Sequence, residues 1–358
     1  MTLAVPYNVY DLDLKDWQDQ AAAWGEPKFR AGQIWQGLYQ QLWSSPGEFT
    51  NLPASLRVRL GQQFRFSALS PSQVLLSSDR ETVKTLFLLE DARAIEAVLM
   101  KYNQRRTLCI STQAGCAMGC VFCATGQMGF KRSLTRGEIV EQVLYFARRL
   151  KQAGERVTNI VVMGMGEPFH NFDATLGAID LLNDPQGFNL GERRFTISTV
   201  GLVPMIRKFA ALKRQVNLAI SLHAANDELR TSLLPVNRKY PLTDLLAACR
   251  EYIEATNRRL TFEWALIQDV NDLPEHAREL GHLLKGMLCH VNVIPLNPTR
   301  KYSGRATTHQ RAEAFKIELE KLGIPCTIRI RRGIDIQAGC GQLAVESKDK
   351  SSLRGNPS

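Results

Sequence analysis

Three zones of the chain differ in how apolar and polar residues alternate. The first zone, up to about residue 70, has apolar residues at helical spacing. It predicts three short helices, over residues 14–24, 28–43 and 53–64. The second zone contains two aliphatic runs on either side of a turn at residues 90–93, which predicts a β-hairpin. The third zone begins near residue 106, where short apolar runs alternate with longer amphipathic segments.

This third zone predicts six strand–helix units in succession. The strands are expected over residues 107–112, 157–163, 195–198, 216–221, 260–267 and 291–294. The helices are expected over residues 135–150, 173–182, 203–212, 242–257, 274–287 and 309–322. Such an alternation is typical of parallel strands covered by helices, either as an open doubly wound sheet or as a partial barrel. One more strand is expected at residues 326–330, followed by a disordered tail over 347–358.

Composition narrows the class of protein. A chain of 358 residues that is 44% hydrophobic can bury a sizeable core. Its net charge of +10, with basic residues that recur in pairs such as Arg105–Arg106 and Arg193–Arg194, indicates an anionic partner with a phosphate backbone. A merely solubilising excess of charge is the alternative.

The sequence also indicates where the protein works. It has no apolar run of eighteen residues, and its amino terminus lacks the basic and apolar pattern of an export signal. We therefore expect a cytoplasmic monomer with no membrane partner. Eight cysteines, three of them clustered, indicate metal-binding and catalytic thiols in a reducing compartment rather than a disulfide framework.

The clustered cysteines are Cys116, Cys120 and Cys123, in a loop loosened by Gly115 and Gly119. Thiolates select zinc, copper(I) or iron–sulfur clusters. Structural zinc sites and ordinary four-iron clusters take four protein ligands, whereas this loop offers three, which would leave one iron of a cluster open. The spacing resembles the signature of radical S-adenosylmethionine (SAM) enzymes, in which SAM chelates the open iron. A zinc-bound loop with a ligand recruited by folding, or three unrelated buried thiols, remains the alternative.

Four short motifs each follow a predicted strand. They lie at residues 164–168 (Gly-Met-Gly-Glu-Pro), 198–201 (Ser-Thr-Val-Gly), 221–223 (Ser-Leu-His) and 295–298 (Pro-Leu-Asn-Pro). The carboxyl ends of parallel strands meet at one edge of a sheet or barrel, where active sites are built. Glycine backbone, a carboxylate, hydroxyls and an amide are the groups that an adenosyl ligand needs.

Together with Cys109 and the closing segment 335–343 (Asp-Ile-Gln-Ala-Gly-Cys-Gly-Gln-Leu), these motifs closely resemble the bacterial dual-specificity RNA methyltransferases, the ribosomal large subunit methyltransferase N family. The resemblance covers about residues 25–345. It implies an α/β fold: a partial (β/α)6 radical SAM barrel with a small N-terminal helical domain and a β-hairpin extension. The implied divisions are an accessory RNA-binding domain at 1–75, a hairpin linker at 76–104, the core at 105–335, and a catalytic loop and tail at 336–358.

The resemblance implies the cofactors and their ligands. Cys116, Cys120 and Cys123 would bind one [4Fe-4S] cluster, and two molecules of SAM would be used in each turnover. The residues matched to SAM binding are Gly166, Glu167, Ser198, Ser221, Leu222, His223 and Asn297. His223 alone would more often be a structural histidine.

The resemblance also implies a reaction, methylation of adenine carbon 2 at position 2503 of 23S rRNA and position 37 of tRNA. Cys340 would accept a methyl group and, after hydrogen abstraction, attach it to the base. Cys109 would then release the product by forming a transient disulfide with Cys340. Glu96 would accept the carbon-2 proton, although a solvated strand residue is the alternative. Flavodoxin or ferredoxin would donate electrons.

Two other functions stay open at this point. One is methylation of adenine carbon 8 by the related antibiotic-resistance enzymes, which share the same functional cysteines. The other is a zinc-bound, non-catalytic RNA-binding protein.

Overall fold

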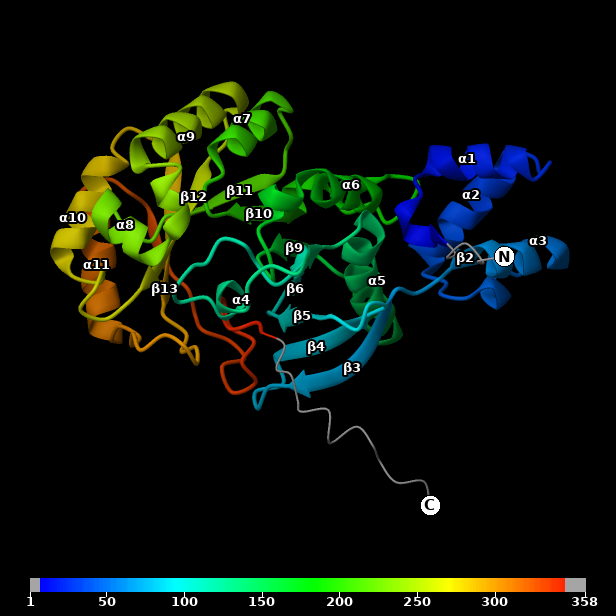
Figure 1. Ribbon diagram of the computed structural model, residues 1–358, viewed down its shortest axis with the longest axis horizontal. Helices are drawn as coiled ribbons and strands as arrows, with labels where there is room; N and C mark the ends of the chain where they lie inside the picture. The colour runs from blue at the N-terminus through cyan, green and yellow to red at the C-terminus, as the bar shows by residue number, and fades with distance from the viewer. Residues whose placement is uncertain (1–6, 345–358) are drawn as a thin grey trace, which may run out of the picture.

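A ten-stranded mixed sheet organises the computed structural model, which describes residues 7–344 (Figure 1). Its strand order is β14-β13-β12-β11-β10-β9-β6-β5-β4-β3. The tail predicted to be disordered at 347–358 lies outside the described residues. The seven strands from β6 to β14 run parallel: β6 (Arg106–Cys109), β9 (Asn159–Val162), β10 (Phe195–Thr199), β11 (Asn217–Ser221), β12 (Leu260–Leu266), β13 (Cys289–Pro295) and β14 (Cys326–Ile328).

Each of the first six parallel strands leads into a covering helix, so the predicted run of six strand–helix units is confirmed. The helices are α5 (Arg136–Gln152), α6 (Phe172–Asn183), α7 (Val203–Ala211), α9 (Leu242–Thr256), α10 (Pro274–Leu283) and α11 (His309–Lys321). The start of α5 follows from its sequence, because Thr135 and Glu138 cap each other's backbone amides. Two short helices escaped prediction, α4 (Ala124–Gln127) and α8 (Asp227–Leu233).

The predicted hairpin is confirmed as β4 (Thr82–Leu89) and β5 (Ala94–Lys101), and a further strand, β3 (Leu69–Leu76), joins it. These three strands are antiparallel and continue the barrel sheet through the pairing of β5 with β6. The extension is therefore rigidly joined to the strand that carries Cys109. Strand β3 escaped prediction because most of its residues are exposed and Pro71 interrupts the pattern at a bulge.

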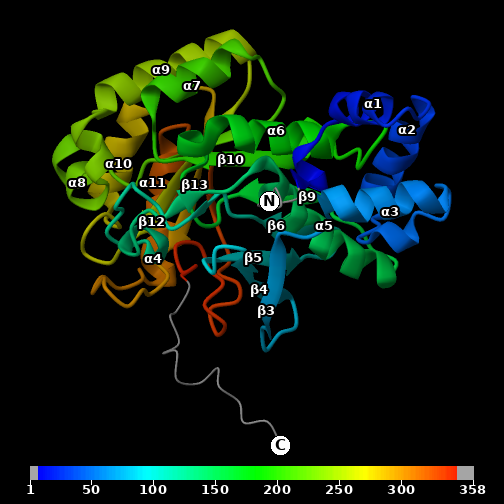
Figure 2. The same ribbon diagram turned by 45° about the vertical axis from the view of Figure 1, so that its right-hand side comes forward.

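The N-terminal helices are α1 (Leu14–Ala23), α2 (Phe29–Gln36) and α3 (Ala54–Gln63). The helix expected over 28–43 changes at Gly37 into a π-helical turn that ends at Leu42, whose φ is 63°. Aromatic residues such as Trp17 and Trp35 are fully buried, and one cluster of apolar side chains runs from them into the barrel. The helices thus pack against the barrel, beside α5 and α6 and opposite α10 and α11 (Figures 1 and 2). Within residues 7–344, no helix has the length and apolar character needed to cross a bilayer.

Candidate active site

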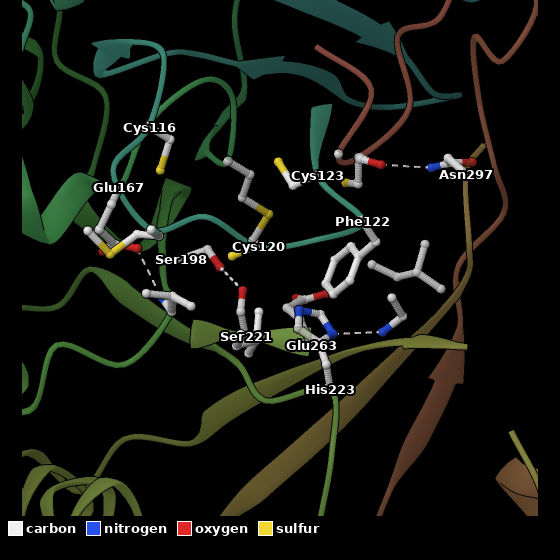
Figure 3. Close-up of a pocket in the computed structure, with 18 of the residues that line it drawn as sticks. Cys116, Cys120, Phe122, Cys123, Glu167, Ser198, Ser221, His223, Glu263 and Asn297 are labelled. Atoms are coloured by element: carbon white, nitrogen blue, oxygen red, sulfur yellow. Dashed lines mark hydrogen bonds between the residues drawn. The ribbon is translucent and has the colours of Figure 1, made fainter. Parts of the chain in front are cut away.

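The motifs predicted to meet do so around one cavity at the carboxyl ends of β9 to β13 (Figure 3). Because these strands are parallel and adjacent, residues that follow them in the sequence become neighbours in space. Of the predicted site residues, those that line this cavity are Cys116, Cys120, Cys123, Gly166, Glu167, Ser198, Ser221, His223, Asn297 and Cys340. Leu222 does not line the cavity. Its side chain is fully buried in the core, and its carbonyl accepts a hydrogen bond from Arg230.

The loop that carries the three cysteines is folded tightly by its glycines. Gly115 and Gly119 have φ values of 74° and 65°, a conformation that other residues adopt reluctantly. A Cβ atom on Gly115 would lie 1.9 Å from the carbonyl oxygen of Gly129. Cys116 is buried and its backbone N–H donates to that same oxygen, while Cys120 and Cys123 are half-buried. The three thiols therefore sit on a fixed backbone and face one space.

The arrangement of these three thiols suits an iron–sulfur cluster. Among residues 7–344, no three His, Cys, Asp or Glu side chains are arranged to hold a single metal ion. The three thiols line one cavity without converging on one point, and the thiolates of an iron–sulfur cluster bind separate iron atoms. Burial raises the pKa of Cys116 to about 12, so that this thiol requires a nearby cation to ionise at neutral pH. Bound iron provides such a charge.

Gly166 and Glu167 form the next wall. Gly166 has a φ of 103°, and a Cβ atom there would lie 2.5 Å from the Cβ of Gln113, so only glycine fits. The Glu167 carboxylate is buried and accepts hydrogen bonds from the backbone N–H groups of Phe169 (3.0 Å) and Val200 (2.9 Å). Burial raises its pKa to about 7 despite these bonds. In its ionised form this carboxylate can form an ion pair with a cationic amino group in the cavity.

Hydroxyl and imidazole groups follow β10 and β11. The hydroxyls of Ser198 and Ser221 lie 3.4 Å apart (Figure 3). His223 has a φ of 60°, and its Nδ1 accepts a hydrogen bond from the backbone N–H of Ala265 at 2.9 Å. Burial lowers the His223 pKa to about 3, so the ring is neutral at physiological pH. His223 lines the cavity and also accepts a backbone hydrogen bond, so its role in binding SAM stays a prediction.

The C-terminal segment closes the cavity. Asn297 Nδ2 donates to the carbonyl oxygen of Cys340 at 3.0 Å, and its buried Oδ1 has no hydrogen-bond partner among the described residues. Gly341 accepts a hydrogen bond from the N–H of Ala124 (2.7 Å), and Leu343 accepts one from the Thr125 hydroxyl (2.6 Å). Glycines flank Cys340 on both sides, as in many mobile loops, yet this segment is anchored. The loop is fixed by bonds to the cysteine loop and to the end of β13.

Comparisons with known proteins agree with this geometry. The radical SAM superfamily model matches residues 110–281, and the model of the ribosomal RNA large subunit methyltransferase N-terminal domain matches residues 7–65. A dual-specificity RNA methyltransferase RlmN 1 of Myxococcus xanthus is 47% identical over 97% of both chains. A probable dual-specificity RNA methyltransferase RlmN of Chloroflexus aurantiacus is 47% identical over 94% of this chain and 92% of its own. The chain belongs to the RlmN family.

A solved structure supports the fold of this RlmN-family chain. The crystal structure of a radical SAM methyltransferase from Sphaerobacter thermophilus is 49% identical and superposes with a TM-score of 0.93, over 94% of this chain and 99% of that one. The predicted α/β radical SAM barrel with its N-terminal domain is thereby confirmed. Membership of the radical SAM superfamily implies a [4Fe-4S] cluster and SAM as cofactors.

Cys109 and Glu96 do not line the cavity and lie on the adjacent strands β6 and β5. Cys109 is buried at the end of β6, and burial followed by the negative charge of Cys340 raises its pKa to about 12. The charge of a Cys340 thiolate would thus act on the Cys109 thiol. Glu96 on β5 is 5% exposed, so the solvated interpretation is wrong. Its carboxylate forms an ion pair with Lys84 at 3.0 Å.

Three charged residues at the site were not predicted. Glu263 on β12 is buried at the cavity wall, with its Oε2 atom 3.7 Å from Arg329, and Oε1 accepts a hydrogen bond from Asn292 at 3.0 Å. Arg230 is fully buried beneath the strand ends. Glu263 could have been noticed as a charge inside an apolar strand. Arg329 and Arg230 carry no comparable signal, because arginine is common after strands and in amphipathic helices.

Proposed function

We propose that the protein methylates carbon 2 of adenine in 23S rRNA and tRNA through a methylated Cys340. The relatives' names as dual-specificity RNA methyltransferases support this activity. One structural observation supports the assignment of residues: Cys340 lines the same cavity as the three clustered cysteines. A thiol that carries the methyl group has to reach the cofactors bound in that cavity.

The cavity residues fall into two groups, which would bind the cluster and SAM respectively. Cys116, Cys120 and Cys123 would hold the [4Fe-4S] cluster, while Glu167, Ser198, Ser221, His223 and Asn297 would hold SAM, with Gly166 allowing close approach. When bound, these cofactors supply the methyl group and the radical chemistry that activates it. The fixed backbone around Gly115 and Gly166 preorganises the site for them.

The two further thiols and Glu96 complete the reaction. The Cys340 thiolate takes the methyl group by displacement, and the activated S-methylene carbon then bonds to carbon 2 of the base. The adduct would return one electron to the cluster, and Glu96 accepts the proton that carbon 2 releases. Cys109 attacks the Cys340 sulfur, so that the sulfur–carbon bond to the RNA breaks and a disulfide remains. The methylene carbon that leaves the sulfur takes up a proton and becomes the methyl group. That disulfide must be reduced before the next turnover.

The remaining assignments accompany this proposal. Residues 1–75 serve as the accessory RNA-binding domain, 76–104 link it through the hairpin, 105–335 form the catalytic core, and 336–358 carry Cys340. The enzyme acts as a cytoplasmic monomer, with flavodoxin or ferredoxin as electron donor and with two molecules of SAM consumed per methyl group transferred.

The test is the identity of the methylated base. Anaerobically reconstituted enzyme, SAM, a strong reductant and 23S rRNA or tRNA should yield 5′-deoxyadenosine and 2-methyladenosine, as resolved by mass spectrometry of nucleosides. A Cys109→Ala variant should accumulate RNA covalently bound to protein, seen as a shifted band on a denaturing gel. Exclusive formation of 8-methyladenosine would replace carbon 2 by carbon 8. A colourless protein with stoichiometric zinc and no SAM cleavage would support a non-catalytic RNA binder instead.

A further inference from the structure

A buried ion pair connects the two inner strands of the antiparallel extension. Lys84 on β4 and Glu96 on β5 lie on neighbouring strands, and Lys84 Nζ is 3.0 Å from Glu96 Oε1. Their side chains are only 8% and 6% exposed. Burying two such charges is costly, and an apolar pair of similar size would often stabilise a sheet at least as well. The pair is therefore a poor device for stabilising the extension alone.

Both charged groups also hold the segment that carries Cys340. Lys84 Nζ donates a hydrogen bond to the carbonyl oxygen of Gln337 at 3.2 Å. Glu96 Oε2 accepts one from the backbone N–H of Ala344 at 3.1 Å. These contacts lie three residues before and four residues after Cys340, so the ion pair grips the loop on both sides of the thiol. In Figures 1 and 2 this segment, drawn in red, runs beside β4 and β5.

The two contacts differ in kind from the others that hold the segment. Asn297 and Thr125 bond to it from the barrel side and from the cysteine loop. The ion pair bonds to it from the extension, through groups that are charged and buried. Hydrogen bonds to charged groups are stronger than neutral ones. Through these two contacts the extension binds the segment that carries Cys340 directly.

We propose that Lys84 is a positioning residue that holds the Cys340 loop and the Glu96 carboxylate in one fixed arrangement. Lys84 contacts neither cavity nor reacting atoms; it acts through Glu96 and through the backbone at Gln337. The catalytic meaning of this arrangement rests on the proposed function, in which Cys340 carries the methyl group and Glu96 accepts the proton. The mechanical role of Lys84, fixing the loop, stands on the contacts themselves.

The experiment compares Lys84→Met with Lys84→Arg in the full-length, cluster-loaded enzyme. Methionine keeps the unbranched stem of lysine except for its terminal nitrogen, and so removes the charge and the donors, whereas arginine keeps both. Glu81→Gln is the matched control, because Glu81 pairs with Arg332 of the same segment at 3.6 Å through a half-exposed carboxylate. Amide hydrogen exchange of residues 333–344 and the rate of RNA methylation are measured for each variant, with cluster content and circular dichroism as checks of folding.

For Lys84→Met we expect exchange across residues 333–344 to rise about tenfold or more, since charge-assisted hydrogen bonds to the loop are removed. The rate constant for methyl transfer should fall by at least about tenfold, while the KM for RNA stays within about twofold, as a loss of positioning rather than of binding requires. Lys84→Arg should recover most of both losses. Glu81→Gln should change neither by more than about twofold, as is usual for an exposed pair.

Three outcomes would overturn the inference. The first is exchange that stays at the wild-type level in Lys84→Met. The second is faster exchange with an unchanged rate of methylation. The third is a Lys84→Arg variant as impaired as Lys84→Met. If Lys84→Met does not fold, Lys84→Gln, which retains a donor without charge, replaces it with an intermediate effect expected. Because exchange is read without substrate, a wild-type enzyme that methylates no RNA would refute the proposed function and leave the exchange comparison intact.

Discussion

At the scale of single residues, the binding wall of the cavity depends on a buried cation that does not line it. The Arg230 guanidinium donates hydrogen bonds to the carbonyl oxygens of Val200 (2.7 Å) and Leu222 (3.1 Å), and to Asn237 Oδ1 (2.7 Å). Those carbonyls belong to the chain just after β10 and β11. Desolvation lowers the pKa of Arg230 to about 10, which keeps it charged at neutral pH. One side chain therefore fixes two of the motifs proposed to bind SAM.

Replacing Arg230 by Met should destabilise the protein and weaken SAM binding together. The guanidinium donates hydrogen bonds to two separate carbonyl oxygens, and its loss leaves these buried acceptors without a donor. We expect this to lower the free energy of unfolding by about 3 kcal/mol. We expect SAM affinity to fall by about tenfold or more because the two strand ends loosen. Arg207→Met is the control, since Arg207 makes an exposed pair with Glu251 and should cost less than about 1 kcal/mol. Urea unfolding and SAM titration report the two effects, and an unchanged SAM affinity in Arg230→Met would contradict this role.

His223 makes a different prediction, about pH. Its pKa falls from 6.5 to about 3 in the folded state because burial disfavours the charged ring. Below pH 6.5 the unfolded chain binds a proton at this histidine and the folded chain does not. The contribution of neutral His223 to the free energy of unfolding is therefore complete above pH 6.5 and is lost as the pH falls toward 3. The stability advantage of wild type over His223→Asn should shrink by about 1.4 kcal/mol per pH unit below 6.5. Paired urea titrations between pH 5 and 8 would show it, and parallel curves would count against it.

At the scale of elements, the entry into the extension is tied to the first barrel helix. Glu141 on α5 is buried and accepts hydrogen bonds from the backbone N–H groups of Ala68 (2.8 Å) and Leu69 (3.3 Å) and from the Ser67 hydroxyl. Burial raises the pKa of Glu141 in spite of these bonds. The chain between α3 and β3 is thus fixed to the barrel by one carboxylate.

Removing this carboxylate should loosen the extension without touching the cavity. Glu141→Leu leaves buried backbone donors unpaired and should lower the free energy of unfolding by about 2–3 kcal/mol. Glu141→Gln keeps an acceptor and should lose less than half of that. Denaturant unfolding measures both, and amide exchange at residues 67–76 should rise in the leucine variant. Equal losses in the two variants would show that charge, not hydrogen bonding, is what matters there.

The same elements show what a sequence can predict. Local signals were sufficient where a residue type is required by the local backbone. Examples are Thr135 and Glu138, which cap the start of α5, and Gly166, which adopts a positive φ after β9. The strand–helix alternation predicted the parallel sheet, and parallel strands brought the motifs together. What failed depended on distant contacts: β3 pairs with β4 although its own residues are mostly exposed, and Arg230 finds its carbonyl partners only after folding. The anchored Cys340 loop likewise depends on Lys84 and Glu96, far away in sequence.

At the scale of the whole molecule, one group of basic residues lies away from the cavity. A cleft beside the N-terminal helices has Arg105, Lys151, Arg156 and Arg194 among its lining residues, and its one lining carboxylate, that of Glu155, is paired with Arg106. Arg105, Arg156 and Arg194 directly precede or lie close before β6, β9 and β10, so the cleft is at the amino ends of these strands, and the carboxyl ends of β9 and β10 form part of the cavity. A strand of four or five residues separates the two by about 15 Å. An extended polyanion such as RNA is long enough to reach both.

This separation predicts how RNA binding responds to salt. Neutralising Arg156 and Arg194 together by Gln should weaken RNA binding and reduce the slope of log affinity against log salt by about 0.7–0.9 for each RNA phosphate that the variant no longer neutralises. The methylation rate at saturating RNA should not change, because neither residue lines the cavity. Arg207→Gln combined with Lys208→Gln, on the outer helix α7, removes the same charge elsewhere. Since long-range attraction depends on net charge but counterion release depends on direct phosphate binding, equal slopes for the two double variants would place the RNA away from this cleft.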